Sequence, residues 1–224
     1  MANETGGFGF RSVYTLGSSP AVQGLSEYPI KSAPGKGLFQ NNPCSKQGAG
    51  DTGYLQDAAN ATMDDGIAGG YQWANNTANI LPMTGVFNGA FYISNSTSKP
   101  TWANSVASGT TFATDYNTGS ADGIGFVNDN PNQEYVVKAD AAAAVSIMVP
   151  DLTYNTEDGA TAGTTHEGQS QSKLDIGSSA AAGAGQAAFM IVRVANDPLN
   201  SDNSVLNANY IVRFAPGSIM SVKY

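Results

Sequence analysis

Oxygen-bearing side chains occupy every second position within the segment NDNPNQE, at Asn128, Asn130, Asn132 and Glu134. Calcium loops use a similar alternation to direct successive ligands at one ion. This segment, however, has no glycine for the sharp turn, carries Pro131 at its centre and offers one carboxylate in the alternating set. Proline and asparagine are also the ordinary residues of tight turns. We therefore predict a turn between two strands, with a weak calcium site as the alternative.

Two other polar clusters raise the same question. The segment NDPLNSDN follows an apolar run and carries Asp197, Asn200, Asp202 and Asn203, which a connecting loop explains better than an ion site. Asp64 and Asp65 are adjacent, so their side chains point apart, whereas a general acid and base must converge on one substrate. We predict turns at both places and no metal site.

Nucleophilic catalysis finds little support in the sequence. His166 is the single histidine and lies in the segment GTTHEGQS, within a stretch rich in Gly, Ala, Ser and Thr from 159 to 186. Such a stretch holds catalytic geometry poorly. Cys44 is the single cysteine, and isolated cysteines are usually small buried hydrophobic residues. We expect no enzyme activity and no cofactor.

Composition and charge narrow the class of partner. The 224 residues carry a net charge of -8, and only 12% of them are charged. The ten Lys and Arg are scattered singly, whereas phosphate backbones and anionic membranes attract clustered cations. We expect no nucleic-acid or membrane partner. The beginning of the chain lacks the pattern of a secretory signal, so we expect synthesis in a cytoplasm without export by the usual route.

The sequence predicts that these residues are positioned by short strands, which are separated by loops rich in Gly, Asn, Ser and Pro. Apolar or alternating runs predict strands at 89–94, 134–139, 144–149, 172–176, 187–195, 209–215 and 218–224, the last two as a hairpin. Only weak helix signals occur, at 54–63 and 140–148. The pattern predicts an all-β, antiparallel β-sandwich or barrel with long loops.

The N-terminal third differs from the rest. Residues 1–53 contain four prolines and many glycines, which suit short edge strands and not a central strand. We predict an extended arm over residues 1–53 and a β-rich body over residues 54–224, with a loop-rich part of the same domain as the alternative. Aromatic and Arg side chains are enriched in interface cores. We therefore predict intersubunit or partner contacts at Phe8, Phe10, Arg11, Tyr14 and Tyr28, the alternative being a buried core.

Several segments, taken in order, carry a resemblance to a known family. GFRSVYTLGSSPAVQGLSEYPI resembles the opening of tailed-bacteriophage head decoration (cement) proteins, and GLFQNNPC resembles the step that follows it. FVNDNPNQEYVVKAD, GQSQSKLDIGSS and FMIVRVANDPLNSDNSVLNANYIVRFAP resemble later segments of that family. The similarity lies in the shared order along nearly the whole chain. The region from Tyr54 to Ala121 and the ending FAPGSIMSVKY depart from the family pattern.

The resemblance implies a structural protein of the virion, placed on the outer face of the capsid. Its partners would be the major capsid protein and further copies of itself, most simply as a homotrimer. It would stabilise the capsid lattice against the pressure of packaged DNA. A second interpretation, a virion surface or tail adhesin with a carbohydrate-binding β-module, would require a groove lined by Trp73 or Trp102.

Overall fold

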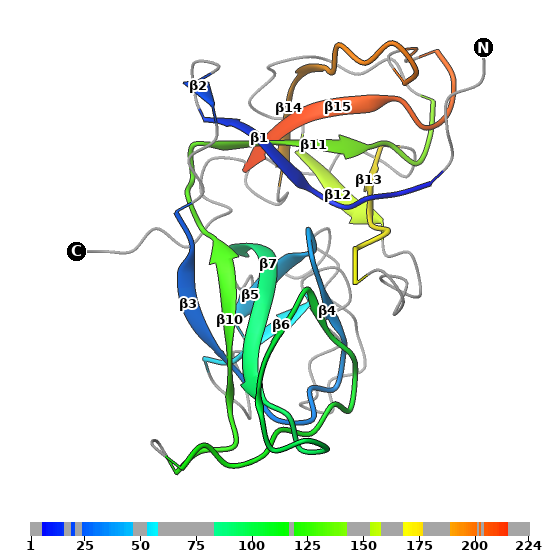
Figure 1. Ribbon diagram of the computed structural model, residues 1–224. Helices are drawn as coiled ribbons and strands as arrows, with labels where there is room; N and C mark the ends of the chain where they lie inside the picture. Colours follow the sequence, from blue (N-terminus) through cyan, green and yellow to red (C-terminus); the bar gives the residue numbers. More distant parts are fainter. Residues whose placement is uncertain are drawn as a thin grey trace, which may run out of the picture.

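The computed structural model describes residues 6–15, 19–20, 24–46, 53–57, 83–116, 119–142, 153–157, 168–176, 189–200, 202 and 204–214. All regular elements in these ranges are β-strands, and all strand pairs are antiparallel. The all-β, antiparallel fold class is therefore confirmed. Figure 1 shows two sheets, which we call the upper and the lower sheet from their places in that view.

The upper sheet has seven strands in the order β13-β12-β14-β15-β11-β1-β2. Their bounds are β1 Arg11–Thr15, β2 Ser19–Pro20, β11 Gln133–Lys138, β12 Thr153–Glu157, β13 Lys173–Asp175, β14 Phe189–Val194 and β15 Asn209–Phe214. The central strands come from the apolar runs of the C-terminal half, because their alternating side chains can cover a core on one face. In β15, Tyr210, Val212 and Phe214 are buried together in that core, as the alternation predicts.

The lower sheet has the order β3-β10-β7-β5-β6, and β8 pairs with the C-terminal half of β7. Its strands are β3 Ser26–Ile30, β5 Pro43–Lys46, β6 Leu55–Asp57, β7 Met83–Ile93, β8 Pro100–Ala103 and β10 Gly123–Asn128. A small ribbon of β4 Leu38–Phe39 and β9 Ser105–Val106 lies at its side. Neither sheet closes on itself within the described strands, so the arrangement is sandwich-like and the barrel alternative is excluded.

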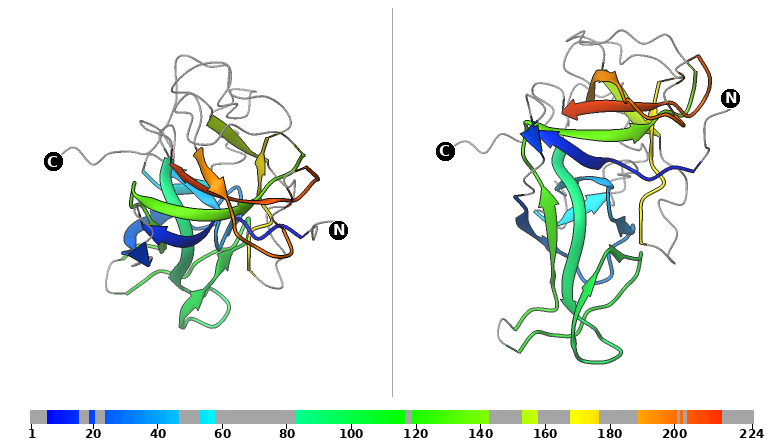
Figure 2. Two further views of the ribbon diagram at one scale, coloured as in Figure 1. Left: turned by 90° about the horizontal axis from the view of Figure 1, so that it is seen from above. Right: turned by 45° about the horizontal axis from the view of Figure 1, so that its top comes forward.

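The two sheets are stacked so that the strands of the upper sheet cross above the ends of the lower strands (Figures 1 and 2). One core lies under the upper sheet and includes Tyr135 and Phe189, while a second lies within the lower part and includes Leu38 and Val127. Strand β7 contributes to both, because Met83 belongs to the first core and Phe87 to the second. The long strand thereby ties the two halves together.

The described strands of the segment predicted as an arm are built into both sheets. Strand β1 pairs with β11 in the upper sheet, and β3 and β5 pair with β10 and β7 in the lower sheet. Phe10, Ile30 and Leu38 are fully buried in the two cores. Of the short strands in this segment, β1 and β5 each lie between two partner strands, whereas β2 and β3 lie at sheet edges. Proline is tolerated there because an edge strand leaves backbone amides without a ladder partner.

Three further predictions need correction or lie outside the described residues. The start of the weak helix at 54–63 is strand β6, whose Leu55 and Asp57 are buried while Gln56 is half-buried. The strands predicted at 144–149 and 218–224 lie outside the described residues, and so does the hairpin with the latter. The strands predicted at 134–139, 172–176, 187–195 and 209–215 correspond to β11, β13, β14 and β15. The strand predicted at 89–94 is the C-terminal half of the longer β7.

Candidate functional site

The segment between β10 and β11 is a turn, as the sequence predicts, and it carries the chain from the lower sheet to the upper sheet (Figure 1). The Asn130 N–H donates to the Asn128 side-chain oxygen at 3.3 Å, and the Asn132 N–H donates to the Asn130 side-chain oxygen at 2.9 Å. The Gln133 N–H closes the turn on the Asn130 carbonyl at 3.1 Å. Side-chain oxygens that accept local backbone amides are typical of turns.

Buried amides then fasten this turn to β1. The Asn128 Nδ2 donates to Ser12 Oγ and to Gln133 Oε1, both at 3.3 Å. The Gln133 Nε2 donates to the carbonyl of Tyr14 at 2.6 Å. The Glu134 carboxylate faces another way and pairs with Arg193 at 3.2 Å. The alternating oxygens therefore do not converge on one point, and the calcium alternative loses its geometric basis.

The loop after β14 is also held by its own hydrogen bonds. The Asp197 carboxylate accepts the Leu199 N–H at 3.0 Å and the Asn209 Nδ2 at 2.7 Å, while the buried Asn200 Nδ2 donates to the Asn207 carbonyl. Asn203 lies outside the described residues, as do Asp64, Asp65 and His166. Nowhere in the described ranges do three His, Cys, Asp or Glu side chains gather as metal ligands would.

Cys44 is buried inside the lower part and not exposed as a nucleophile would be. Its Sγ donates to the Gly85 carbonyl at 3.5 Å, and burial raises the pKa of the thiol well above its usual value, with the Asp57 carboxylate adding to the effect. A thiol with a raised pKa is a poor nucleophile because the reactive form is the thiolate. The prediction of a small buried hydrophobic residue is confirmed.

The five predicted contact residues separate into three environments. Phe10 is fully buried and stacks on Phe189 at 4.3 Å between ring centroids, so it belongs to the core of its own chain. Its prediction as a surface contact is wrong. Tyr28 is half-buried in the lower sheet, with the Lys46 ammonium 4.7 Å from its ring centre. Phe8, Arg11 and Tyr14 remain on the surface beside the upper sheet.

Tyr28 serves as an internal hydrogen-bond donor. Its hydroxyl donates to Asp129 Oδ2 at 2.8 Å, which links β3 to the segment that changes sheets. Burial raises the pKa of the Tyr28 hydroxyl well above its usual value, and the hydrogen bond to the Asp129 carboxylate raises it further. The hydroxyl therefore keeps its proton and the bond at neutral pH.

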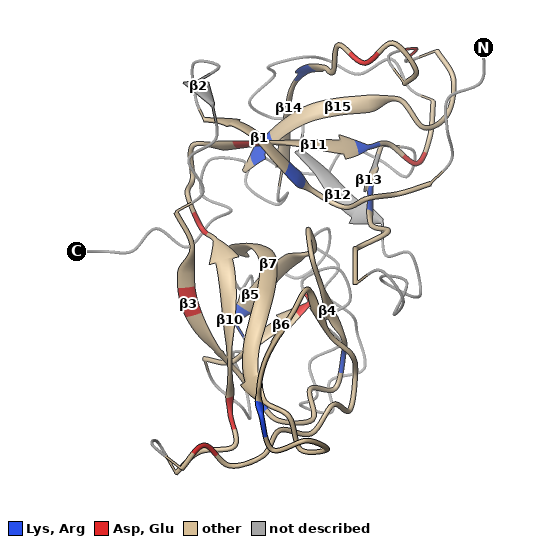
Figure 3. Ribbon diagram, viewed as in Figure 1, with Lys and Arg blue, Asp and Glu red and all other residues tan. Residues whose placement is uncertain are grey.

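Phe8, Arg11 and Tyr14 lie on one surface where cations gather. The Arg11 guanidinium lies 5.0 Å from the centre of the Phe8 ring, and the Lys138 ammonium lies 5.8 Å from it. Arg193 reaches across the sheet to lie 5.2 Å from the Tyr14 ring centre. Figure 3 shows cations on β1, β11, β14 and β15 of this sheet. In an acidic chain, this surface is locally basic and aromatic.

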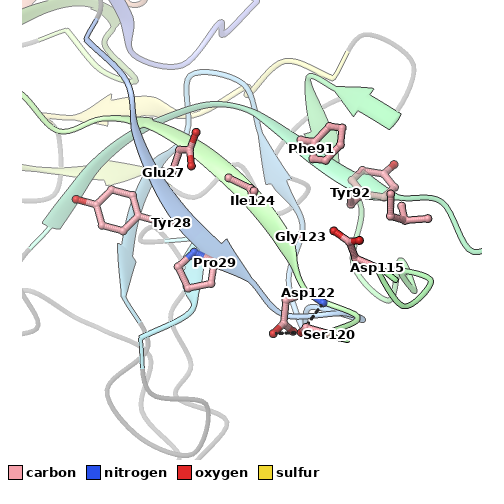
Figure 4. Close-up of a pocket in the computed structure, with 11 residues that line it drawn as sticks. Glu27, Tyr28, Pro29, Phe91, Tyr92, Asp115, Ser120, Asp122, Gly123 and Ile124 are labelled. Carbon is pink, nitrogen blue, oxygen red and sulfur yellow. Dashed lines mark hydrogen bonds between the residues drawn. The ribbon is translucent and has the colours of Figure 1, made fainter. Parts of the chain in front are cut away.

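A depression of about 270 Å³ lies at the far end of the lower sheet (Figure 4). Apolar side chains such as Phe91 and Ile124 form one part of its lining, and the carboxylates of Glu27, Asp115 and Asp122 lie around them. The Asp122 Oδ2 accepts hydrogen bonds from the Tyr54 hydroxyl at 2.8 Å and from Ser120 Oγ at 2.7 Å. These bonds hold the connection that leads into β10, which is a structural use of the carboxylate.

A second depression, of about 390 Å³, lies on the same sheet beside Trp102. Trp102 is one of the two tryptophans that the sequence singles out, and its side chain is 71% exposed. Trp73 lies outside the described residues. The sequence does not reveal the neighbours Phe91 and Phe126, because they come from strands β7 and β10 that pair only in the folded sheet.

Comparisons with protein-family models, with curated proteins and with solved structures find no match to this chain. The described residues include no helix that is long and apolar enough to span a membrane.

Proposed function

We propose that this protein is a non-enzymatic structural protein that decorates the outer face of a bacteriophage head and stabilises the lattice of the major capsid protein. The observation that carries the proposal is the position of the segments that resemble the decoration family. Among their strands, β1, β11, β15 and β14 are consecutive neighbours in the upper sheet, although they come from opposite ends of the sequence, while β3 and the end of β10 belong to the lower sheet. The segments that carry the resemblance therefore include paired strands as well as turns.

The chemistry of the described residues supports a binding role over catalysis. The two polar clusters that lie in the described ranges, at 128–134 and 197–200, are engaged in turns and sheet connections. The surface that remains around Phe8, Arg11 and Tyr14 combines aromatic rings with cations, which are the side chains enriched in protein interfaces. We propose that this surface contacts the major capsid protein or a second copy of the chain, in a homotrimer on the virion.

Co-sedimentation with capsid shells tests the proposal. The full chain is mixed with undecorated shells of the major capsid protein, and bound protein is measured after centrifugation. We expect saturable binding and a higher melting temperature of the shells, because many copies each contribute an interface of about 800 Å² per partner. No binding by a folded protein would refute the capsid proposal.

Charge reversal locates the contact surface. Arg11→Glu should weaken shell binding by about tenfold, because the new carboxylate replaces a cation in the interface, which slows association and repels the partner. Lys99→Glu is the matched control, because Lys99 is an exposed cation at the turn before β8 in the lower sheet. Equal effects of the two variants would argue against the surface around Arg11.

A further inference from the structure

An aromatic cluster lies on the solvent-facing side of the lower sheet, opposite the face that packs on the second core. Trp102 is the most exposed member. Its indole stacks on the Phe126 ring, with centroids 5.1 Å apart and planes inclined by 19°, and it also meets Phe91 at 4.9 Å. An antiparallel sheet with one solvated face usually presents polar side chains there. An apolar cluster on this face therefore points to a ligand.

The register of three strands builds the cluster. Strands β8 and β10 both pair with β7, one on each side, so Trp102 and Phe126 start from strands about 10 Å apart. Gly89 of β7 pairs directly with Phe126, between the two strands that carry the rings. A Cβ added at Gly89 would come closest to the backbone oxygen of Ala103, at 3.2 Å, and would have no atom of either ring within 4 Å. The stack is thus a product of the sheet and not of a loop.

A bulge in β7 adds a polar group beside the rings. The pairing of β7 with β10 shifts between Phe126 and Val127, and Asn88 is the extra residue on β7. Bulges often redirect a side chain next to a functional site. The Asn88 oxygen accepts a hydrogen bond from Gln40 Nε2 at 3.3 Å, which fixes the orientation of its amide. A directed amide therefore lies next to an exposed indole.

The depression at this place, of about 390 Å³, has a mixed lining without ionisable groups. Trp102, Phe126 and Leu25 supply apolar surface, and Asn88 and Asn104 supply amides. The size falls in the range of small-molecule sites, which are apolar with a few placed polar groups. The Asn104 amide carries both a donor and an acceptor for a neutral hydroxyl, and Asn88, whose oxygen accepts from Gln40, can donate to one from its Nδ2.

These features select one class of ligand. The electron-rich face of an aromatic ring attracts the weakly positive C–H groups of a sugar ring, while the amides can bond its hydroxyls. Single-stranded nucleic acids also stack on aromatic rings, but their sites add cations along the backbone, and no Lys or Arg lines this depression. An acidic saccharide would lack a cationic partner for the same reason.

We propose that the depression beside Trp102 binds a neutral saccharide, with the sugar ring against the indole and its hydroxyls on the amides of Asn88 and Asn104. This inference goes beyond capsid decoration and does not depend on it. A head protein with such a site would hold the particle at neutral glycans of a cell surface or of its surroundings.

Titration of the free protein tests the site without any capsid. The Trp73→Phe variant leaves Trp102 as the single tryptophan. Neutral oligosaccharides of glucose, galactose, mannose and N-acetylglucosamine are each added up to about 10 mM, with a glucuronate oligomer as the acidic comparison. We expect a saturable change of Trp102 fluorescence for at least one neutral oligosaccharide, with a dissociation constant of about 0.1–1 mM.

Variants measured by calorimetry connect the binding to the residues. Trp102→Ala should weaken binding at least tenfold, Trp102→Phe should retain part of it, and Asn104→Ala should weaken it several-fold. Tyr116→Ala is the matched control and should bind like the parent, because Tyr116 is an exposed aromatic residue, 98% accessible, that does not line the depression.

Three results would overturn the proposal. One is the absence of binding to all four neutral sugars by a protein whose circular dichroism shows that it is folded. Another is unchanged saccharide binding by Trp102→Ala. The third is loss of shell co-sedimentation by Trp102→Ala together with no saccharide binding by the parent protein, which would identify this face as a protein interface. Failure of shell binding alone leaves the saccharide result intact.

Discussion

Replacing Phe10 by alanine should destabilise the whole fold, although Phe10 lies near the beginning of the chain. The side chain is fully buried in the first core and stacks on Phe189 with ring planes inclined by 19°. Removing a buried phenylalanine costs about 3–5 kcal/mol, and the lost aromatic pair contributes to that figure. We expect a loss of about 4 kcal/mol in the free energy of unfolding. The melting temperature should then fall by about 8–16 °C.

Phe8→Ala provides the matched control, two residues away in the same segment. Phe8 is half-buried and lies against two cations, the exposed Arg11 and the buried Lys138. Exposed cation–π contacts contribute about 0.5–1 kcal/mol. We therefore expect Phe8→Ala to cost about 1 kcal/mol or less. The large difference between two phenylalanines follows from their different burial.

Urea unfolding followed by circular dichroism measures both variants as free protein. If the N-terminal segment were an arm that folds only on a partner, neither substitution would change the unfolding of the body. A loss below about 1 kcal/mol for Phe10→Ala would therefore refute the packing described for β1 and its preceding residues.

Three further outcomes follow from the buried groups and the turn. The free energy of unfolding should fall as the pH rises above about 8.5, because the Cys44 thiol then loses its proton in the unfolded chain, while burial keeps it protonated in the folded protein. Urea unfolding between pH 7 and about 10 should therefore show a smaller decline for Cys44→Ala than for the parent. Gly85→Ala should cost about 1–3 kcal/mol in urea unfolding, since its Cβ would lie 2.3 Å from the backbone oxygen of Asn128 at a φ of +159°, whereas Gly35→Ala, with no atom within 4 Å, should be nearly neutral. About 5 mM CaCl₂ should leave the melting temperature unchanged in the parent and in Asn130→Ala. A rise in the melting temperature of the parent alone would instead support a calcium site in this turn.

The strands of the C-terminal half could be predicted because their pattern is local. In β15, the alternation of Tyr210, Val212 and Phe214 with Ile211 and Arg213 matches the period of a strand, and the core uses one face of it. The predicted ends of this strand differ from the observed ones by one residue at most. Burial in a sheet centre also selects β-branched residues, which makes such runs visible.

The N-terminal strands could not be predicted in the same way. Strand β3 has five residues, includes Pro29 and pairs with β10 far along the chain. Its alternation of burial is too short, and too interrupted by proline, to be distinguished from a loop in the sequence. Its buried end, Ile30, is surrounded by residues of several other strands. The edge strands that the composition indicates match β2 and β3 but not β1 or β5, because the pairing partners depend on the complete fold.

The site beside Trp102 could likewise be predicted only in part from the sequence. Trp102 could be selected because tryptophan is rare in this chain and suits sugar rings. Its stack on Phe126 depends on strand register, because β7 pairs with β10 on one side and with β8 on the other. A shift of one residue would move every side chain to the other face, and no pattern within a single strand specifies which residues of three strands meet.

The hydrogen bonds between β1 and the segment that changes sheets have a consequence for synthesis on the ribosome. Ser12 and Asn128 are 116 residues apart in sequence, and Tyr14 and Gln133 are 119 residues apart. At roughly 5–20 residues per second, β1 must wait on the order of 10 s for its partner to be translated. During that time Phe10 lacks Phe189, and β1 can form only its two-residue ladder with β2. Slower, cooler expression and a chaperone that shields nascent chains should therefore increase the soluble yield, more so for this chain than for one whose first strands pair with each other along their whole length.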